Sequence, residues 1–309
     1  MSTLAKPEKS TTPLIHNLVF GLVGPYGAGS SSLAEDLNRV VADFPNCLVK
    51  TIHVATLIEN DFRLLMNSEP QSQELTGPER RKSLQRVGTE LRKIDLEWVG
   101  NAIVAEIYRL GREFEQNGAL HGKKLLAFVV DSVKNMNDVK VLRRVYGAEF
   151  YLISLHAPHD ERWLRMKQYK NWSDKDRAEF EKCDEIDSDE KVYNPSVGDA
   201  GQQVSKVVAI ADYHIANTQN REQLARHGTR LVNLLFGYGS SQATFHERSM
   251  HLAFSAARRS YCLSKQVGAA IVDLGGNVLG IGHNDVPKAG GGLYSSETID
   301  KRCYAVSYT

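Results

Sequence analysis

The sequence has few of the features that mark a secreted, membrane or zinc-ribbon protein. It contains four cysteines, Cys47, Cys183, Cys262 and Cys303, and no two of them form a C-x-x-C pair. Such scattered cysteines suit a reducing compartment and exclude a local zinc ribbon. No run of about 18 apolar residues occurs, so no membrane span is expected. Residues 1–13 also lack the apolar core of a secretion signal. We therefore expect a cytoplasmic protein without a membrane partner.

The chain also lacks an excess of either charge. It has 38 Lys and Arg against 37 Asp and Glu, for a formal net charge of +1. This balance gives no bulk attraction toward nucleic acid or a membrane surface. The length of 309 residues and 42% apolar content allow ordinary globular cores, with two domains as the natural expectation. The polar residues 1–16 read as a disordered lead-in.

What the sequence does contain is a strand, a glycine loop and a helix in succession. Residues 18–23 form a short apolar run that predicts a buried strand. Gly24, Gly27 and Gly29 follow, and apolar residues at helical spacing begin at Leu33. Glycines let backbone amides approach phosphate oxygens, and the helix N-terminus adds positive potential. The stretch therefore predicts a nucleotide phosphate site.

The loop fits the Walker A pattern G-x-x-x-x-G-K-[ST] with one departure. Gly24 and Gly29 stand at the glycine positions, and Ser31 stands where the magnesium-binding hydroxyl belongs. Ser30 occupies the lysine position, and Ser32 completes the run of candidate phosphate-binding residues. The usual lysine neutralises charge on the transferring phosphate. Without it, backbone amides can still bind a nucleotide, but phosphoryl transfer should suffer.

Two alternatives concern this loop and its missing cation. A glycine turn can join a strand to a helix without binding anything, and Lys6 or Lys50 could replace the absent lysine.

A second predicted strand contributes to the same site. The apolar run 124–131 predicts a central parallel strand that ends in Asp131. Asp131 is placed like a Walker B acid, which would hold Mg²⁺ together with Ser31. The alternative for Asp131 is a turn or helix-capping acid.

The rest of the first domain alternates between helical and strand patterns. Arg80, Arg81 and Arg86 either reach phosphates or lie on a solvated helix face. Residues 168–204 are dense in charge and read as a mobile lid or as a surface excursion. The predicted elements are a strand at 47–55, a helix at 78–116, a helix that starts within 135–138 with Asn137 or Asp138 as its cap and runs through Val145, a strand at 150–155, a helix near His159, a strand region at 207–217 and a helix at 221–236. This order predicts a doubly wound parallel α/β domain.

Residues 17–237 resemble the P-loop nucleoside-monophosphate-kinase-like proteins. The segments that carry this resemblance are residues 131–139, Leu142-Arg143, Tyr146-Gly147, 150–153, Ala157-Pro158, 184–187, Gln202 or Gln203, and 211–217. Residues 238–244 then form a small polar linker. A second, partial domain is predicted at 245–309, with a helix at 245–260, strands at 266–273 and 278–282, and a hairpin turn at Gly275-Gly276.

The opening of this second domain resembles the zinc-dependent cytidine/deoxycytidylate deaminases. The resemblance rests on 260–262, 266–269, 282–284 and Pro287, and 290–294 is similar to fused kinase-like deaminases of bacterial phage defence. It implies hydrolytic removal of ammonia from a cytosine nucleotide such as dCMP or dCTP, with Zn²⁺ as cofactor. It also implies substrate-binding roles for Gln266, Gly268 and Asn284. The alternative for Asn284 is a strand-end turn residue.

The zinc-binding signature of those deaminases, H-x-E followed by P-C-x-x-C, is not found before Thr309. His246-Glu247 lacks the intervening residue, and 159–161 matches H-x-E without the cysteine pair. We therefore expect the front part of a longer deaminase, inactive alone, whose uncovered hairpin favours homo-oligomers. Two alternatives remain: a module that senses nucleotides (NTP or dNTP) or nucleic acid and controls a partner protein or regulatory RNA, and a nucleoside monophosphate kinase.

Overall fold

The computed structural model describes residues 16–66, 77–169, 171–218, 220–238, 242–288 and 290–294. The chain divides into two compact units, Met1–Gly237 and Tyr238–Thr309, which we call unit 1 and unit 2. Of the predicted lead-in, only His16 falls within the described residues, and Lys6 and Cys303 lie outside them. Each unit is described by itself.

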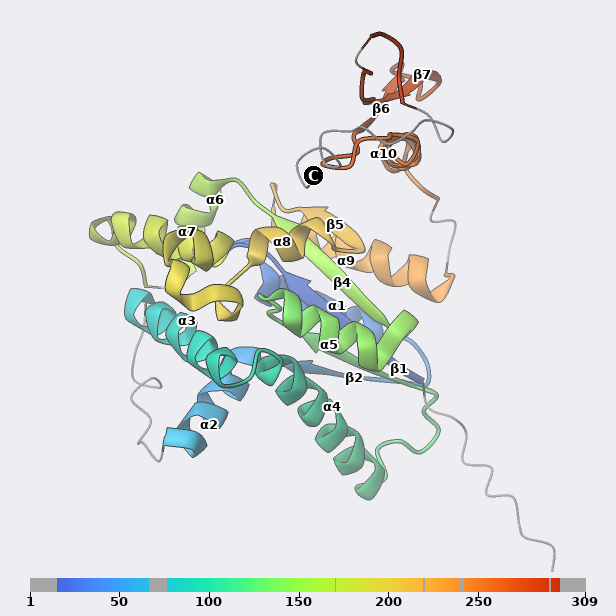
Figure 1. Cartoon of the computed structure of the whole chain (residues 1–309). Coiled ribbons are helices and arrows are strands. Elements are labelled where there is room, and N and C mark those ends of the chain that lie inside the picture. The colour runs from blue at the N-terminus through green and yellow to red at the C-terminus, as the bar shows by residue number, and fades with distance from the viewer. Residues whose placement is uncertain are drawn as a thin grey trace, which may run out of the picture. The chain divides into compact units, whose positions relative to one another are not determined.

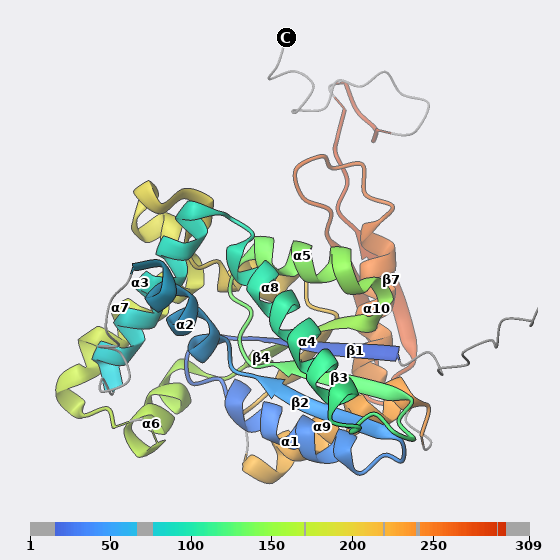
Figure 2. The same ribbon diagram turned by 90° about the horizontal axis from the view of Figure 1, so that it is seen from below.

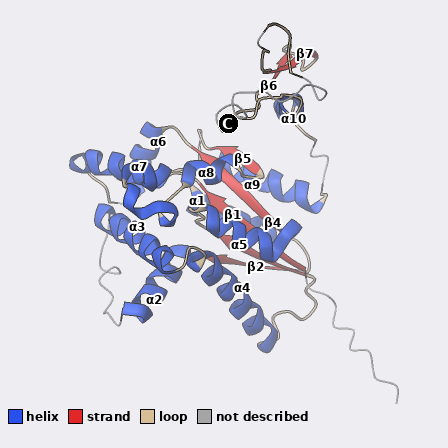
Figure 3. Ribbon diagram, viewed as in Figure 1, coloured by secondary structure: helices blue, strands red, loops and turns tan. Residues whose placement is uncertain are grey.

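Unit 1 is built on a five-stranded, fully parallel sheet with strand order β2-β3-β1-β4-β5 (Figures 1 and 3). The strands are β1 (His16–Val23), β2 (Cys47–Ile52), β3 (Leu125–Val130), β4 (Phe150–His156) and β5 (Tyr213–Ala216). The apolar run in β1 becomes the central strand, so the loop that follows it leaves the middle of the sheet. Its neighbours β3 and β4 are also apolar and buried, as central parallel strands require.

Helices cover both faces of this sheet. The helices of unit 1 are α1 (Ser30–Ala42), α2 (Val54–Met66), α3 (Gly77–Ile94), α4 (Trp98–Gln116), α5 (Met136–Tyr146), α6 (His159–Tyr169), α7 (Arg177–Tyr193), α8 (Val204–Ala209) and α9 (Arg221–Phe236). Because side chains alternate along a strand, Val19 and Phe20 of β1 enter separate cores on opposite faces. Figure 2 shows α1 and α9 on one side of the sheet and α4 and α5 on the other. The predicted doubly wound α/β fold is confirmed.

The structure corrects two predicted elements. The single helix expected at 78–116 is two helices, α3 and α4, which separate at Asp95. There the Asp95 carboxylate accepts the N–H of Glu97 at 2.9 Å, and its carbonyl accepts the N–H of Trp98 at 2.9 Å. The strand region expected at 207–217 is a short helix, α8, followed by the brief strand β5. Apolar runs of this length fit either element, so periodicity alone did not separate them.

The charged segment 168–204 is not a solvated surface excursion. Phe180 and Asp187 of α7 are fully buried, and Trp172 is 4% exposed. Trp163, Trp172 and Phe180 pack as one small aromatic core, and Tyr26 from the glycine loop lies against it. The helix α7 is therefore anchored beside the loop by a core of its own.

Unit 2 contains the predicted helix and hairpin, α10 (Phe245–Ala257), β6 (Gly268–Val272) and β7 (Val278–His283). Thr244 and Glu247 form a capping box that begins α10. A Cβ atom at Gly268 would lie 1.9 Å from the carbonyl oxygen of Ala253, so only glycine lets β6 pack against this helix. Ile271 and Leu279 on the hairpin are 65% and 68% exposed, which leaves part of its apolar surface uncovered.

Candidate functional site

The glycine loop between β1 and α1 has a backbone that other residues cannot easily adopt. Gly27 and Gly29 have φ angles of 85° and 106°, in the region that favours glycine. A Cβ atom at Gly29 would lie 2.5 Å from Nδ2 of Asn217, and one at Gly24 would lie 2.8 Å from the carbonyl oxygen of Leu155. The glycine spacing of the sequence is thus required by both conformation and close packing.

Three side chains hold the carbonyl groups of this loop from outside. Arg162 Nη1 donates to the Tyr26 oxygen at 3.0 Å, and Asn217 Nδ2 donates to the Ala28 oxygen at 2.8 Å. A longer contact of 3.4 Å joins Arg165 Nη1 to the carbonyl oxygen between them. In a trans peptide the N–H points opposite to the C=O, so the contacts to Tyr26 and Ala28 turn the amides of Gly27 and Gly29 away from these side chains. The N–H of Ala28 instead donates to the Pro25 carbonyl within the loop at 3.0 Å.

The first turn of α1 supplies further amides to the loop. The N–H groups that open a helix have no intrahelical acceptor, and Gly29 begins α1 without any side-chain cap. The amides of Ser30, Ser31 and Ser32 therefore gather at a helix N-terminus, where backbone dipoles favour an anion. This geometry suits a phosphate group. Phosphate binding by these residues remains a prediction.

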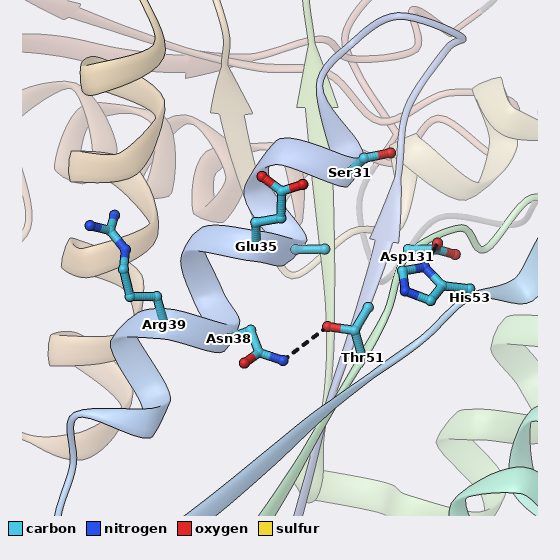
Figure 4. Close-up of a pocket in the computed structure, with 8 residues that line it drawn as sticks. Ser31, Glu35, Asn38, Arg39, Thr51, His53 and Asp131 are labelled. Atoms are coloured by element: carbon cyan, nitrogen blue, oxygen red, sulfur yellow. Dashed lines mark hydrogen bonds and ion pairs between the residues drawn. The ribbon is translucent and has the colours of Figure 1, made fainter.

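The cavity next to the loop brings two predicted residues together. It has a volume of about 400 Å³ and is lined by Ser31, Ala34, Glu35, Asn38, Arg39, Thr51, His53 and Asp131. Figure 4 shows Ser31 at the start of α1 and His53 beside Asp131. The hydroxyl of Ser31 and the carboxylate of Asp131 thus reach one space from α1 and from the end of β3. Hard oxygen donors of this kind suit Mg²⁺, which keeps several waters and takes few protein ligands.

Asp131 also organises the turn that begins α2. Its Oδ1 accepts the N–H of Val54 at 3.0 Å, and its Oδ2 lies 2.9 Å from Nδ1 of His53. The side chain is 17% exposed, so the carboxylate keeps access to the cavity. These are the contacts expected for a turn acid, and they fix the carboxylate without consuming all its lone pairs. His53 was not singled out from the sequence, which placed it inside the strand predicted at 47–55, whereas β2 ends at Ile52.

A lysine that the sequence analysis did not select lies near the loop. Lys50, one of the two considered replacements, is in the middle of β2 opposite Phe128 and does not line the cavity. Lys134 instead follows Asp131 by three residues, in the connection between β3 and α5. Its Nζ donates to Asp187 Oδ2 at 2.5 Å, and its side chain is 14% exposed. The sequence feature that could have indicated Lys134 is its position three residues after Asp131, an acid expected at the carboxyl edge of the sheet.

Lys134 belongs to a group of charges that we call the buried ion cluster: Arg81, Lys134, Arg162, Asp184 and Asp187. Arg81 pairs with Asp187 and lies over the ring of Tyr26, 4.6 Å from its centroid. Arg162 holds Asp184 through two bonds of 2.5 and 2.7 Å. The interpretation of Arg81 as part of a solvated face is wrong, because this residue is 8% exposed.

Burial and neighbouring charges move two pKa values in this cluster. The pKa of Lys134 is lowered from the ordinary 10.5 to about 8, chiefly by burial and also by the like charge of Arg81. The carboxylates that face it from α7, Asp187 and Asp184, act in the opposite direction. Burial alone would raise the pKa of Asp187, but the positive charges of Arg81 and Lys134 outweigh this effect and lower it.

We expect Lys134 to make stability depend on pH in the alkaline range. Its folded pKa of about 8 lies below the ordinary 10.5, so the unfolded chain binds more protons between these values. Titration of Lys134 therefore raises the free energy of unfolding as the pH rises from about 8 to 10.5, by up to about 1.4 kcal/mol per pH unit. Below about pH 8 it leaves the free energy of unfolding independent of pH. The check is urea unfolding of the wild type and of Lys134→Met at about pH 7 and about pH 9.5. Parallel pH profiles would contradict it.

In unit 2 the three predicted substrate-binding residues have backbone contacts. Asn284 accepts the N–H of Val267 at 2.7 Å and donates to the carbonyl of Lys265 at 2.8 Å. These bonds join the segment before β6 to the residue after β7, at the end of the hairpin opposite its turn. Gln266 Nε2 donates to the carbonyl of Ser260 at 2.8 Å. Gly268 provides the close approach to α10 described above. These contacts match the turn alternative for Asn284, and a substrate role for the three residues remains a prediction.

The described residues contain neither a candidate metal centre nor a candidate membrane span. Between residues 16 and 294, apart from the gaps in the description, no three His, Cys, Asp or Glu side chains meet in a way that could hold a metal ion. The described residues therefore do not fit a zinc centre. None of the helices in the described part of the chain has the length and apolar character needed to cross a membrane.

Comparisons with known proteins found similarity at the level of solved structures. No protein-family profile and no curated protein matches this chain. Among solved structures, shikimate kinase from Acinetobacter baumannii in complex with shikimate is 14% identical over 75% of this chain and 98% of its own, with a TM-score of 0.35. TT1252 from Thermus thermophilus is 18% identical over 73% and 100%, with a TM-score of 0.38. The Mycobacterium tuberculosis APS kinase CysC, in complex with AMPPNP and APS, is 12% identical over 72% and 99%, with a TM-score of 0.33.

Proposed function

We propose that unit 1 is a nucleotide-binding module that holds the phosphate chain of a nucleoside triphosphate on its glycine loop. The observation that carries the proposal is the outward anchoring of the loop carbonyls by Arg162 and Asn217. With the carbonyls held away, the loop and the start of α1 present N–H groups to an anion. The cavity beside Ser31 and Asp131 offers room for the bound phosphates.

Each residue has a defined part in this binding. The amides of Ser30 and Ser31 donate to phosphate oxygens, and the hydroxyl of Ser31 with the carboxylate of Asp131 would hold Mg²⁺. Bound Mg²⁺ supplies charge neutralisation between phosphate oxygens. His53 keeps Asp131 oriented through the 2.9 Å contact. Because Ser30 replaces the lysine that stabilises phosphoryl transfer, we propose binding and sensing ahead of kinase activity, with nucleoside monophosphate phosphorylation as the less favoured activity.

The expected result is that the intact chain binds at least one of ATP, GTP and the dNTPs in isothermal titration with Mg²⁺. Ser31→Ala should weaken binding of the Mg²⁺ complex about tenfold, since it removes a metal ligand, and should change binding without Mg²⁺ much less. Ser249→Ala is the matched control, because Ser249 donates only to a carbonyl within α10 of unit 2. No heat with any nucleotide would reject the proposal.

A second candidate function adds the deaminase resemblance of residues 245–294. Its support is the helix followed by an antiparallel hairpin, with Gly268 packed against that helix. On this proposal, unit 1 regulates a zinc deoxycytidylate deaminase of phage defence, and this chain alone releases no ammonia from dCMP or dCTP. A reading frame that continues past Thr309 into H-x-E and P-C-x-x-C would support it, and a stop codon there would reject it.

A further inference from the structure

The buried ion cluster holds more positive than negative charge. Arg81, Lys134 and Arg162 face two carboxylates, Asp184 and Asp187, which lie one helical turn apart on α7. At the edge of the cluster, Lys82 pairs with two carboxylates, Glu79 and Glu179, at 3.3 Å each. An uncompensated charge is costly inside a protein. Counted alone, the five groups of the cluster are one anion short of neutrality.

Arg81 has an unused donor in addition to this excess charge. Its Nε atom is buried and has no hydrogen-bond partner among the described residues, and the whole residue is 8% exposed. Asp187 is meanwhile held by Arg81, by Lys134 and by Gln85 Nε2 at 2.8 Å. Two cations and an amide around one carboxylate are the donors that a phosphoryl group would also use.

The cluster is next to the glycine loop. Arg81 stacks on the ring of Tyr26, and Arg162 binds the carbonyl oxygen of the same residue. The connection that carries Lys134 is also tied to the end of β1, because the N–H of Val133 donates to the carbonyl of Leu22 at 2.8 Å. The two arginines thus contact the glycine loop, and the connection that carries Lys134 is bonded to β1. The cluster is therefore attached to the strand and loop that precede α1.

We propose that Arg81 and Lys134 form a phosphoryl-binding subsite beside the glycine loop, which Asp187 occupies in this structure and which supplies the positive charge that Ser30 lacks. The inference rests on the proposed nucleotide binding. A phosphoryl group of the nucleotide competes with the Asp187 carboxylate for the two cations and satisfies Arg81 Nε. Its binding releases α7 at Asp187, while Asp184 stays on Arg162. Nucleotide occupancy is thereby linked to the position of α7.

The test is titration of ATP and of pyrophosphate into the intact wild type, Asp187→Asn and Lys134→Met. Asp187→Asn should bind both at least tenfold more tightly, because the internal competitor has lost its charge. Lys134→Met should bind at least fivefold more weakly, and adding Ser30→Lys to it should restore affinity. Asp138→Asn is the matched control, since it also breaks a buried ion pair of α3, with Arg92, and should leave affinity unchanged.

The outcomes separate this inference from the proposed function. Nucleotide binding by the wild type with equal affinity in Asp187→Asn and Lys134→Met would overturn the subsite and leave nucleotide binding intact. Binding by Asp187→Asn without any binding by the wild type would reject nucleotide binding by the native chain, and the inference with it. No binding in any variant would reject both. If Asp187→Asn does not fold, Lys134→Met and its Ser30→Lys rescue decide, because Asp187 keeps Arg81 as a partner in that variant.

Discussion

Asp138→Ala is expected to lower the free energy of unfolding by about 3–5 kcal/mol. Asp138 is fully buried at the start of α5 and accepts two bonds from Arg92 of α3, at 3.2 and 2.6 Å. Arg92 is itself 4% exposed, and it also donates to the carbonyl of Gly88. Removing the carboxylate leaves a guanidinium without its counter-charge in the core, and that group cannot lose its proton. Urea unfolding at neutral pH measures the loss.

A surface ion pair provides the comparison for this prediction. Arg144 makes bonds of 2.9 and 2.6 Å to Glu97, but the two side chains are 58% and 35% exposed. Arg144→Ala should cost less than about 1 kcal/mol, because water solvates the remaining carboxylate. The double variant Arg92→Met with Asp138→Ala should lose far less than the sum of the single losses. Equal losses for Asp138→Ala and Arg144→Ala would show that the buried pair does not hold α3 against α5.

The loop and the sheet could be predicted because their signals are local. A continuous apolar run followed by spaced glycines specifies a strand, a turn and a helix start within about 20 residues. The run at 124–131 marks β3 for the same reason, and β1, β3 and β4 then occupy the centre of the sheet as apolar strands must. The capping box of α10, formed by Thr244 and Glu247, is an equally local signal, although neither residue was singled out from the sequence.

The buried ion cluster could not be predicted, because its partners are distant in the chain. Arg81 and Asp187 are 106 residues apart, and Lys134 and Asp187 are 53 apart. A charged residue in a polar helix is usually solvated, so the sequence favours the surface for each of them separately. Only the fold shows that α3, α7 and the connection after β3 meet beside the glycine loop. The sequence therefore offered Lys6 and Lys50 as replacements for the cation missing at Ser30, and not the proposed Arg81 and Lys134.

Asp131 shows a different limit of prediction. Its position after β3 places it at the carboxyl edge of the parallel sheet, the edge where ligands usually bind in such folds. The same position makes it the acceptor for the start of α2, through Val54 and His53. A carboxylate can serve both purposes, since it has about four lone-pair sites. The sequence presented these roles as alternatives, whereas the geometry makes them compatible.

Arg162→Met is expected to weaken nucleotide binding more than tenfold and to lower the free energy of unfolding by about 3 kcal/mol. Arg162 is 5% exposed and donates to the carbonyls of Ala157 and Tyr26 as well as to Asp184. Methionine retains much of the apolar contact but none of the donors. The Tyr26 carbonyl then loses the group that holds it outward, and Asp184 loses its counter-charge. Titration with ATP and urea unfolding measure the two effects separately.

Arg165→Met is the matched control for this change, because both arginines belong to α6 and contact the same loop. Arg165 is more exposed, at 22% of its side chain, and its direct contact with the loop is the 3.4 Å one to Gly27, beside a 2.9 Å bond to the backbone carbonyl of Asn217. It should therefore lose no more than about threefold in affinity, since a long bond contributes little. If Arg162→Met loses stability but binds ATP as tightly as the wild type, the carbonyl anchor does not set the loop conformation. The glycines and Asn217 would then be sufficient to hold the phosphate-binding amides in place.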